Sequence, residues 1–193
     1  MGLNIHYSGQ LKEANMLSSL IDEVEDIVRV NKWKHHIHET VFPENKFCKN
    51  IAFDKIFGIS FLPTNCETIS ITFLSNGLMV CPTRVHLFGD SNIKEERDWI
   101  YTTSVKTQFA GIKTHRLIIL LFKYLDKKYF ANFKLFDESG YWETNDEVIM
   151  KKQFQKYDSL IEKFALAVET FPAQKNENIM AYIERLLKNV NRL

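Results

Sequence analysis

The sequence lacks most features that mark a secreted or membrane-spanning protein. Only three of its 193 residues are cysteines, and Cys48, Cys66 and Cys81 lie far apart without a C-x-x-C pair. An odd number of widely spaced cysteines is not the pattern of a disulfide framework or a zinc ribbon. The longest unbroken apolar run covers residues 117–122 and is far too short to cross a membrane. We therefore expect a soluble protein of a reducing compartment, without a membrane partner.

Targeting signals are also missing from the N-terminal segment. The first ten residues have neither the basic nor the apolar region of a signal peptide. Gly2 suggests a myristoylation motif, but His6 occupies the position where that motif requires serine or threonine. These absences predict a cytoplasmic location.

Neither sign of charge is in excess. The chain has 25 Lys and Arg against 24 Asp and Glu, a formal net charge of +1. Broad nucleic-acid binding relies on a basic excess, so we do not expect it, although a local basic patch is still compatible with this balance. Hydrophobic residues make up 45% and aromatic residues 13% of the chain, which is enough for a well-packed core.

Sequence signatures of catalysis are absent as well. The chain contains no G-x-S-x-G nucleophile motif and no glycine-rich phosphate loop. None of the three cysteines has a histidine signature beside it, and they are expected to fill the core or its margin. These absences favour a protein without enzymatic activity.

The hydrophobic periodicity predicts an α+β fold with an early crossover helix, a buried central helix and a C-terminal helical hairpin. We expect a mixed, mostly antiparallel sheet of about five to seven strands. Residues 89–105 are ambiguous between a short helix and a strand. The predicted strands are 3–8, 35–42, 58–62, 68–74, 78–82 and 132–137, and the predicted helices are 16–33, 112–129, 145–170 and 177–191.

Two local signals refine this prediction. Asn76-Gly77 between β-rich runs predicts a two-residue hairpin that places Phe73 opposite Val80 and Pro82 at an edge or a bulge. Thr144 and Glu147 have the spacing of a capping box at the start of the first C-terminal helix. We divide the chain into a core, 1–139, and a helical hairpin, 140–193, that together form one structural unit.

A cluster of histidines is the first candidate site. Residues 33–40 read WKHHIHET, and on a strand His36 and His38 point the same way, while His35 shares the face of Ile37. If the strand carrying His6 were a neighbour, His6, His36 and His38 could form a three-histidine zinc site of the kind that metal-dependent hydrolases use. The alternative is a polar, solvent-facing strand.

The basic segment 106–116 is the second candidate. Lys113 and Arg116 lie in the first turns of a predicted helix, where cations oppose the helix dipole, and Lys106 and His115 accompany them. Free N–H groups at a helix start suit a phosphate, so these four residues predict an anion- or nucleotide-binding site. The alternative is a solvated helix start that pairs with the acidic segment 137–147.

That acidic segment is the third candidate. Its carboxylates surround Tyr141 and Trp142 and suit the first turn of a helix better than acid–base catalysis. If exposed, the two aromatic residues would anchor a protein interface.

Taken together, these patterns favour a non-enzymatic, bacterial-type interaction or regulatory protein, such as an inhibitor or immunity-like partner. Its partner would be another protein or a second copy of the chain. No cofactor is expected under this hypothesis. The rival hypotheses are a hydrolase with zinc at His6, His36 and His38, and a phosphate- or nucleotide-binding module.

Overall fold

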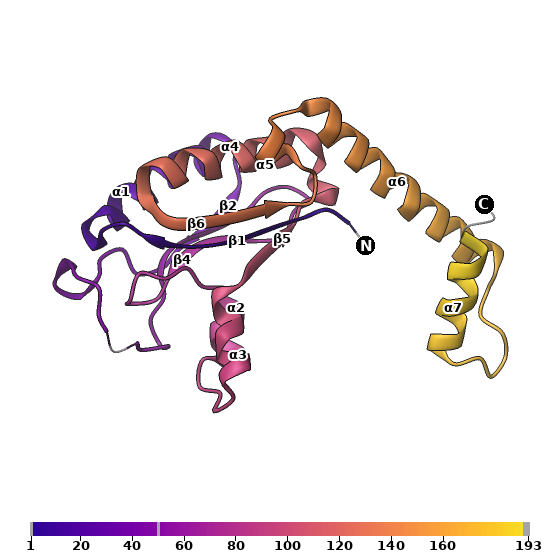
Figure 1. The fold of residues 1–193 in the computed structure, drawn as a ribbon, viewed down its shortest axis with the longest axis horizontal. Coiled ribbons are helices and arrows are strands. Elements are labelled where there is room, and N and C mark those ends of the chain that lie inside the picture. The colour runs from indigo at the N-terminus through magenta and orange to yellow at the C-terminus, as the bar shows by residue number, and fades with distance from the viewer. Residues whose placement is uncertain (1, 50, 191–193) are drawn as a thin grey trace.

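A computed structural model describes residues 2–49 and 51–190 and shows an α+β fold (Figure 1). Its strands form two three-stranded antiparallel sheets, in the orders β5–β1–β6 and β2–β3–β4. The strands are β1 (Asn4–Leu11), β2 (Lys34–Ile37), β3 (Phe57–Leu62), β4 (Ile69–Phe73), β5 (Thr103–Lys106) and β6 (Phe130–Asp137). The α-helices are α1 (Leu17–Val30), α2 (Pro82–Phe88), α3 (Lys94–Asp98), α4 (Gly111–Tyr129), α5 (Tyr141–Thr144), α6 (Glu147–Thr170) and α7 (Ile179–Val190). Short 3₁₀ turns lie at Ala14–Met16, Pro43–Asn45, Trp99–Tyr101 and Gln108–Ala110.

The N-terminal strand and helix form where the hydrophobic pattern predicts them. Alternation along β1 buries Ile5 and Tyr7 and turns His6 outward. Helix α1 buries Leu20, Val24 and the other residues of its apolar stripe against the same core. The prediction of a half-buried strand followed by an amphipathic helix is confirmed.

The strands do not form one sheet, as the sequence pattern predicted, but two. Met79 connects the two sheets. Its amide donates to the Gly9 carbonyl of β1 at 2.9 Å, and it also forms an isolated bridge with Phe73 at the end of β4. The buried Tyr7 hydroxyl donates to the Ser70 carbonyl at 3.0 Å and accepts from the Ser70 amide at 3.1 Å. Side chains from both sheets then share one core. The protein thus has two small sheets that share a core, where the sequence pattern predicted one larger sheet.

This division also corrects the predicted crossover. Strands β1 and β2 belong to different sheets, so the strand–helix–strand segment is not a crossover within one sheet. Strand β2 ends at Ile37, and Glu39 makes only an isolated bridge to Phe57. The predicted strand 35–42 is thus shorter than its polar alternation suggested.

The chain turns at the predicted place, but the turn is not the predicted two-residue Asn76-Gly77 hairpin, because Ser75 and Asn76 are its central residues and only Gly77 has a positive φ. Gly77 has a φ of +77°, and its amide donates to the Leu74 carbonyl at 2.8 Å. Phe73 pairs with Met79 rather than with Val80, and Pro82 begins α2 instead of lying at a strand edge. Proline suits the first turn of a helix as well as a strand edge, because its missing N–H is not needed there.

The central helix α4 packs one face on the core. Ile118, Ile119 and Phe122 are buried, whereas Leu120 and Tyr124 are exposed. The position of the predicted helix is confirmed. The sequence predicts a buried central helix, and the structure buries its face toward the core while leaving its outer face exposed.

The C-terminal helices form an arm that leaves the body (Figure 1). Met150 and Phe154 in the first turns of α6 join the main core, and Ala167 near its end packs on Leu186 of α7 instead. The two helices match the predicted hairpin, apart from residue 191, which lies outside the described residues. The cap differs, since the Asp146 side chain accepts from the amides of residues 148 and 149, as an N-cap does.

Candidate functional site

The basic segment 106–116 and the acidic segment 137–147 meet at His115, inside the protein. The Nδ1 atom of His115 lies 2.7 Å from the Thr107 hydroxyl. Its Nε2 atom lies 2.8 Å from the Ser139 hydroxyl and 3.2 Å from Oδ1 of Asp137. One imidazole thus connects the end of β5, helix α4 and the end of β6.

Asp137 is the acceptor at the centre of this network. One carboxylate oxygen accepts from the Ser139 amide at 2.8 Å, and the other accepts from the Ser139 hydroxyl at 2.7 Å. The amides of Tyr141 and Trp142 also donate to it, at 3.0 and 3.1 Å. Burial opposes ionisation of Asp137, but the hydrogen bonds from His115 and Ser139 outweigh it and hold the pKa of the carboxyl below its usual range.

The buried network is structural. Ser139, His115 and Asp137 carry the functional groups of a serine hydrolase, but all three side chains are inaccessible to solvent and therefore to a substrate. What the network does is fix the turn at Gly140 and the start of α5, from which the chain enters α6.

The other residues of the basic segment lie apart from His115. Lys113 and Arg116 line a hollow of about 640 Å³ with Glu147. The Arg116 guanidinium lies 3.2 Å from the Glu147 carboxylate and donates to the Tyr141 hydroxyl at 3.2 Å. Lys106 lies over the ring of Phe109. The basic helix start therefore pairs with the acidic segment, and the four predicted anion ligands do not converge.

The three histidines of the zinc hypothesis are not brought together. His6 is on β1, whereas His36 and His38 are on the β2 side of the other sheet, with ring centroids 4.6 Å apart. No group of three His, Cys, Asp or Glu residues within 2–49 and 51–190 could hold a metal ion. His35 contacts Glu25 of α1 at 3.0 Å, on the face predicted for it.

His38 itself lies in a polar environment. Its Nε2 atom is 3.0 Å from the Ser60 hydroxyl. Burial, together with the neighbouring His36, lowers the pKa of His38. This favours the neutral imidazole.

Tyr141 and Trp142 contribute to the body of the protein. Tyr141 is buried, and Trp142 is half-buried with its ring 5.9 Å from that of Phe133. Lys123 lies over both rings, at 5.7 and 5.5 Å from their centroids. Tyr141 is therefore not available as an exposed interface anchor.

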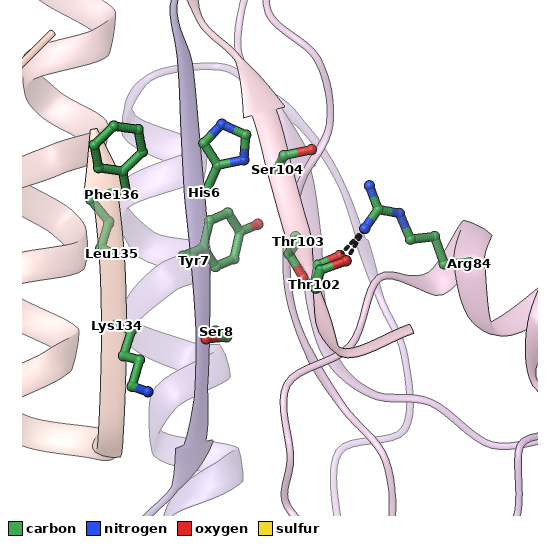
Figure 2. A pocket seen from close by; sticks show the side chains of 10 residues that line it. All are labelled: His6, Tyr7, Ser8, Arg84, Thr102, Thr103, Ser104, Lys134, Leu135 and Phe136. Carbon is green, nitrogen blue, oxygen red and sulfur yellow. Dashed lines mark hydrogen bonds between the residues drawn. The ribbon is translucent and has the colours of Figure 1, made fainter. Parts of the chain in front are cut away.

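The outer face of the β5–β1–β6 sheet carries a shallow groove that the sequence did not reveal (Figure 2). Its volume is about 450 Å³. Strand alternation places His6 and Ser8 of β1, Ser104 of β5 and Phe136 of β6 on this face. The only hint in the sequence is the phase of β6, in which Lys134 and Phe136 share the outward parity.

Two side chains set the character of the groove. Phe136 lies opposite His6 across the strands, and their rings stack with centroids 6.1 Å apart. Arg84 of α2 forms part of the wall, and one of its terminal nitrogens donates to the Thr102 carbonyl at 2.6 Å. The groove combines an exposed aromatic ring with a fixed guanidinium.

The second exposed feature is the apolar face of α7. Ile179 is 73%, Met180 64%, Leu187 50% and Ile183 36% exposed. Tyr182 and Leu186 face α6 instead. Helix α6 therefore covers only one edge of the apolar stripe of α7.

A salt bridge stiffens the connection between the two arm helices. Arg185 donates to Glu177 and to the Pro172 carbonyl, at 2.8 and 3.0 Å. The hydrogen bond from Arg185 holds the pKa of Glu177 at about 2. The exposed face of α7 is thus presented by an ordered hairpin.

Comparison with protein-family models, with curated proteins and with solved structures finds no match to this chain. Among the described residues, no helix is both long enough and apolar enough to span a membrane.

Proposed function

We propose that this protein is a non-enzymatic interaction module that docks on a protein partner through the exposed face of α7. The observation that carries the proposal is the set of four apolar side chains, Ile179, Met180, Ile183 and Leu187, left open to solvent on one side of that helix. Together they expose roughly 450 Å² of mostly apolar surface, which is the size of the largest apolar patch on a typical monomer, and such a patch is often functional.

A second copy of the chain fits this face. Met180, Ile183 and Leu187 follow the three- and four-residue spacing of a helix–helix seam. An antiparallel pair of α7 helices would bury about twice the area of one face, close to the 1,000 Å² at which specific interfaces begin. A dissociation constant on the order of 10 μM is expected for such a small interface.

The charges beside the seam suit an antiparallel pair. Glu184 and Lys188 lie one turn apart beside the seam, on the flank away from α6, and both are exposed. In an antiparallel pair centred near residue 186, Glu184 of one copy lies level with Lys188 of the other. The same side of one helix therefore offers both signs of charge to its twin.

Light scattering coupled to size-exclusion chromatography tests the proposal over about 5 to 200 μM protein, a range that brackets the expected constant. We expect a concentration-dependent dimer that Ile183→Glu abolishes. Lys163→Glu is the matched control, because Lys163 is exposed on the same arm outside both apolar stripes. A wild-type chain that stays monomeric, or a dimer that Ile183→Glu leaves intact, would overturn the proposal.

Charge reversal tests the orientation. Glu184→Lys and Lys188→Glu should each weaken the dimer about tenfold, because each change replaces two attractive contacts by two repulsive ones. The double variant restores the pairing with its signs exchanged and should recover most of the affinity. If the loss of dimer affinity in the double variant equalled the sum of the two single losses, the antiparallel arrangement would be contradicted.

A further inference from the structure

The groove on the β5–β1–β6 sheet has the chemistry of a site for an anionic ligand. Among its lining residues, His6, Arg84 and Lys134 are basic and none is acidic (Figure 2). The Glu138 carboxylate lies 3.5 Å from His6. A chain with a net charge of only +1 therefore concentrates positive charge on this face.

The groove also offers a surface for a planar ring. Phe136 on the edge strand β6 is 60% exposed, and His6 of the central strand β1 stacks beside it. An exposed aromatic ring of this kind gains from contact with another π-system. Nucleobases stack on such rings on the open sheets of RNA-binding domains.

The shape favours a chain over a single small molecule. A second hollow of about 240 Å³ adjoins the first, and both share Ser8 and Lys134. Tyr101 and Asn132 line this second hollow, which also lacks a carboxylate among its described lining residues. A shallow groove that continues along β1 cannot enclose a mononucleotide, but it can follow successive nucleotides.

Arg84 supplies a fixed cation at one wall. Its hydrogen bonds to the carbonyls of Trp99 and Thr102 hold one end of the guanidinium, at 3.3 and 2.6 Å. In Figure 2 the other terminal nitrogen points away from Thr102. A guanidinium ordered in advance loses little freedom when it binds a phosphate.

We propose that this groove binds a short stretch of single-stranded nucleic acid, with a base stacked on Phe136 and phosphates near Arg84 and Lys134. The hydroxyls of Ser8 and Ser104 are placed to accept or donate hydrogen bonds to the sugar or the base. The site is local and does not depend on the arm, so it stands independently of the interaction that α7 is proposed to make.

Fluorescence anisotropy with labelled oligo-U and oligo-dT of about eight nucleotides tests the proposal. At low salt we expect binding in the tens of micromolar, with log K falling against log salt at a slope of about −1.4, as phosphate contacts from the two fixed cations, Arg84 and Lys134, imply for a single strand. Adenosine monophosphate and poly-glutamate should not compete at matched charge concentration. If poly-glutamate competed as strongly as oligo-U, the groove would be assigned to acidic peptides and the proposal would be overturned. If adenosine monophosphate bound as tightly as the oligonucleotides, the proposal would be overturned as well.

Variants separate stacking from charge. Phe136→Ala should weaken binding at least fivefold without changing the salt slope, and Phe136→Trp should retain the affinity. Lys134→Ala should reduce the slope by about 0.7, whereas Lys163→Ala on the arm should leave it unchanged. Because Phe136, Lys134 and Lys163 are exposed, all four variants should melt within a few degrees of the wild type. No binding to either oligonucleotide at low salt, or equal losses in Lys134→Ala and Lys163→Ala, would refute the site.

Discussion

Replacement of Asp137 by asparagine tests whether the buried network holds the fold together. The carboxylate accepts four hydrogen bonds from Ser139, Tyr141 and Trp142 and lies 3.2 Å from His115. The asparagine side chain keeps the size of the aspartate, but it exchanges one acceptor for a donor that would face other donors. Loss of a buried, charge-assisted acceptor of this kind costs about 3 kcal/mol.

The expected loss is large enough to measure by thermal and urea unfolding. A change of about 3 kcal/mol lowers Tm by roughly 6 to 12 °C in a chain of this size. Coincident circular dichroism and tryptophan fluorescence curves would show that a two-state treatment applies. Asp26→Asn, at an exposed position on α1, is the matched control and should change stability by no more than about 0.5 kcal/mol.

The pH dependence gives the sign of the effect. The folded pKa of Asp137 is lowered, so its contribution is complete above the unfolded pKa of about 3.9 and disappears as the pH falls through the folded value. The gap in stability between the wild type and Asp137→Asn should therefore shrink below about pH 4. A loss under about 1 kcal/mol at pH 7, or a gap that is constant down to about pH 3, would refute the argument.

Three further substitutions test the contact between the two sheets and the start of α6. Tyr7→Phe removes the hydroxyl that joins the two sheets and leaves both backbone groups of Ser70 without that partner, so thermal unfolding should show a loss of about 1 to 3 kcal/mol; an unchanged Tm would contradict it. Asp146→Ala should cost about 1 kcal/mol and reduce the helix content of the arm, because the Asp146 side chain caps α6. Glu147→Ala should lower the free energy of unfolding less than Asp146→Ala does. A larger loss for Glu147→Ala would instead support the capping box predicted from Thr144 and Glu147.

Hydrophobic periodicity alone was enough to locate the elements that bury one face and expose the other. Helix α1 follows a stripe of Leu20, Val24 and its neighbours, and each step of that pattern needs only local information. The division of the strands between two sheets could not be read in this way. It depends on contacts such as the one between Tyr7 and Ser70, which are 63 residues apart, and an alternating pattern does not specify which edge a strand pairs with.

Pro82 shows where local rules permit two answers. Its missing N–H excludes a central strand, but it is equally compatible with an edge strand and with the first turn of a helix. The structure has the helix, and Val85 of α2 is buried in a second small cluster with Leu74 and Val80. Only these tertiary contacts decide between the two alternatives.

The buried position of His115 was visible in the sequence, although the basic neighbours drew attention to charge instead. His115 precedes Ile118, Ile119 and Phe122 by three, four and seven residues, which places it on the buried face of α4. Asp137 shares the inward parity of Phe133 and Leu135 on β6. Two polar residues on apolar faces must find partners, and these two find each other.

This pairing also helps to hold the base of the arm, whose tip carries the exposed apolar face of α7. Asp137 fixes the backbone at Tyr141 and Trp142, and Gln108 donates to Asp158 at 2.7 Å, three turns into α6. Beyond that point the buried side chains of the arm, Ala167 and Leu186, pack on each other. The base of the arm is thus held by the body and its tip by its own small cluster. A face preorganised in this way loses little conformational entropy on binding, so even a patch as small as that of α7 can support a specific contact.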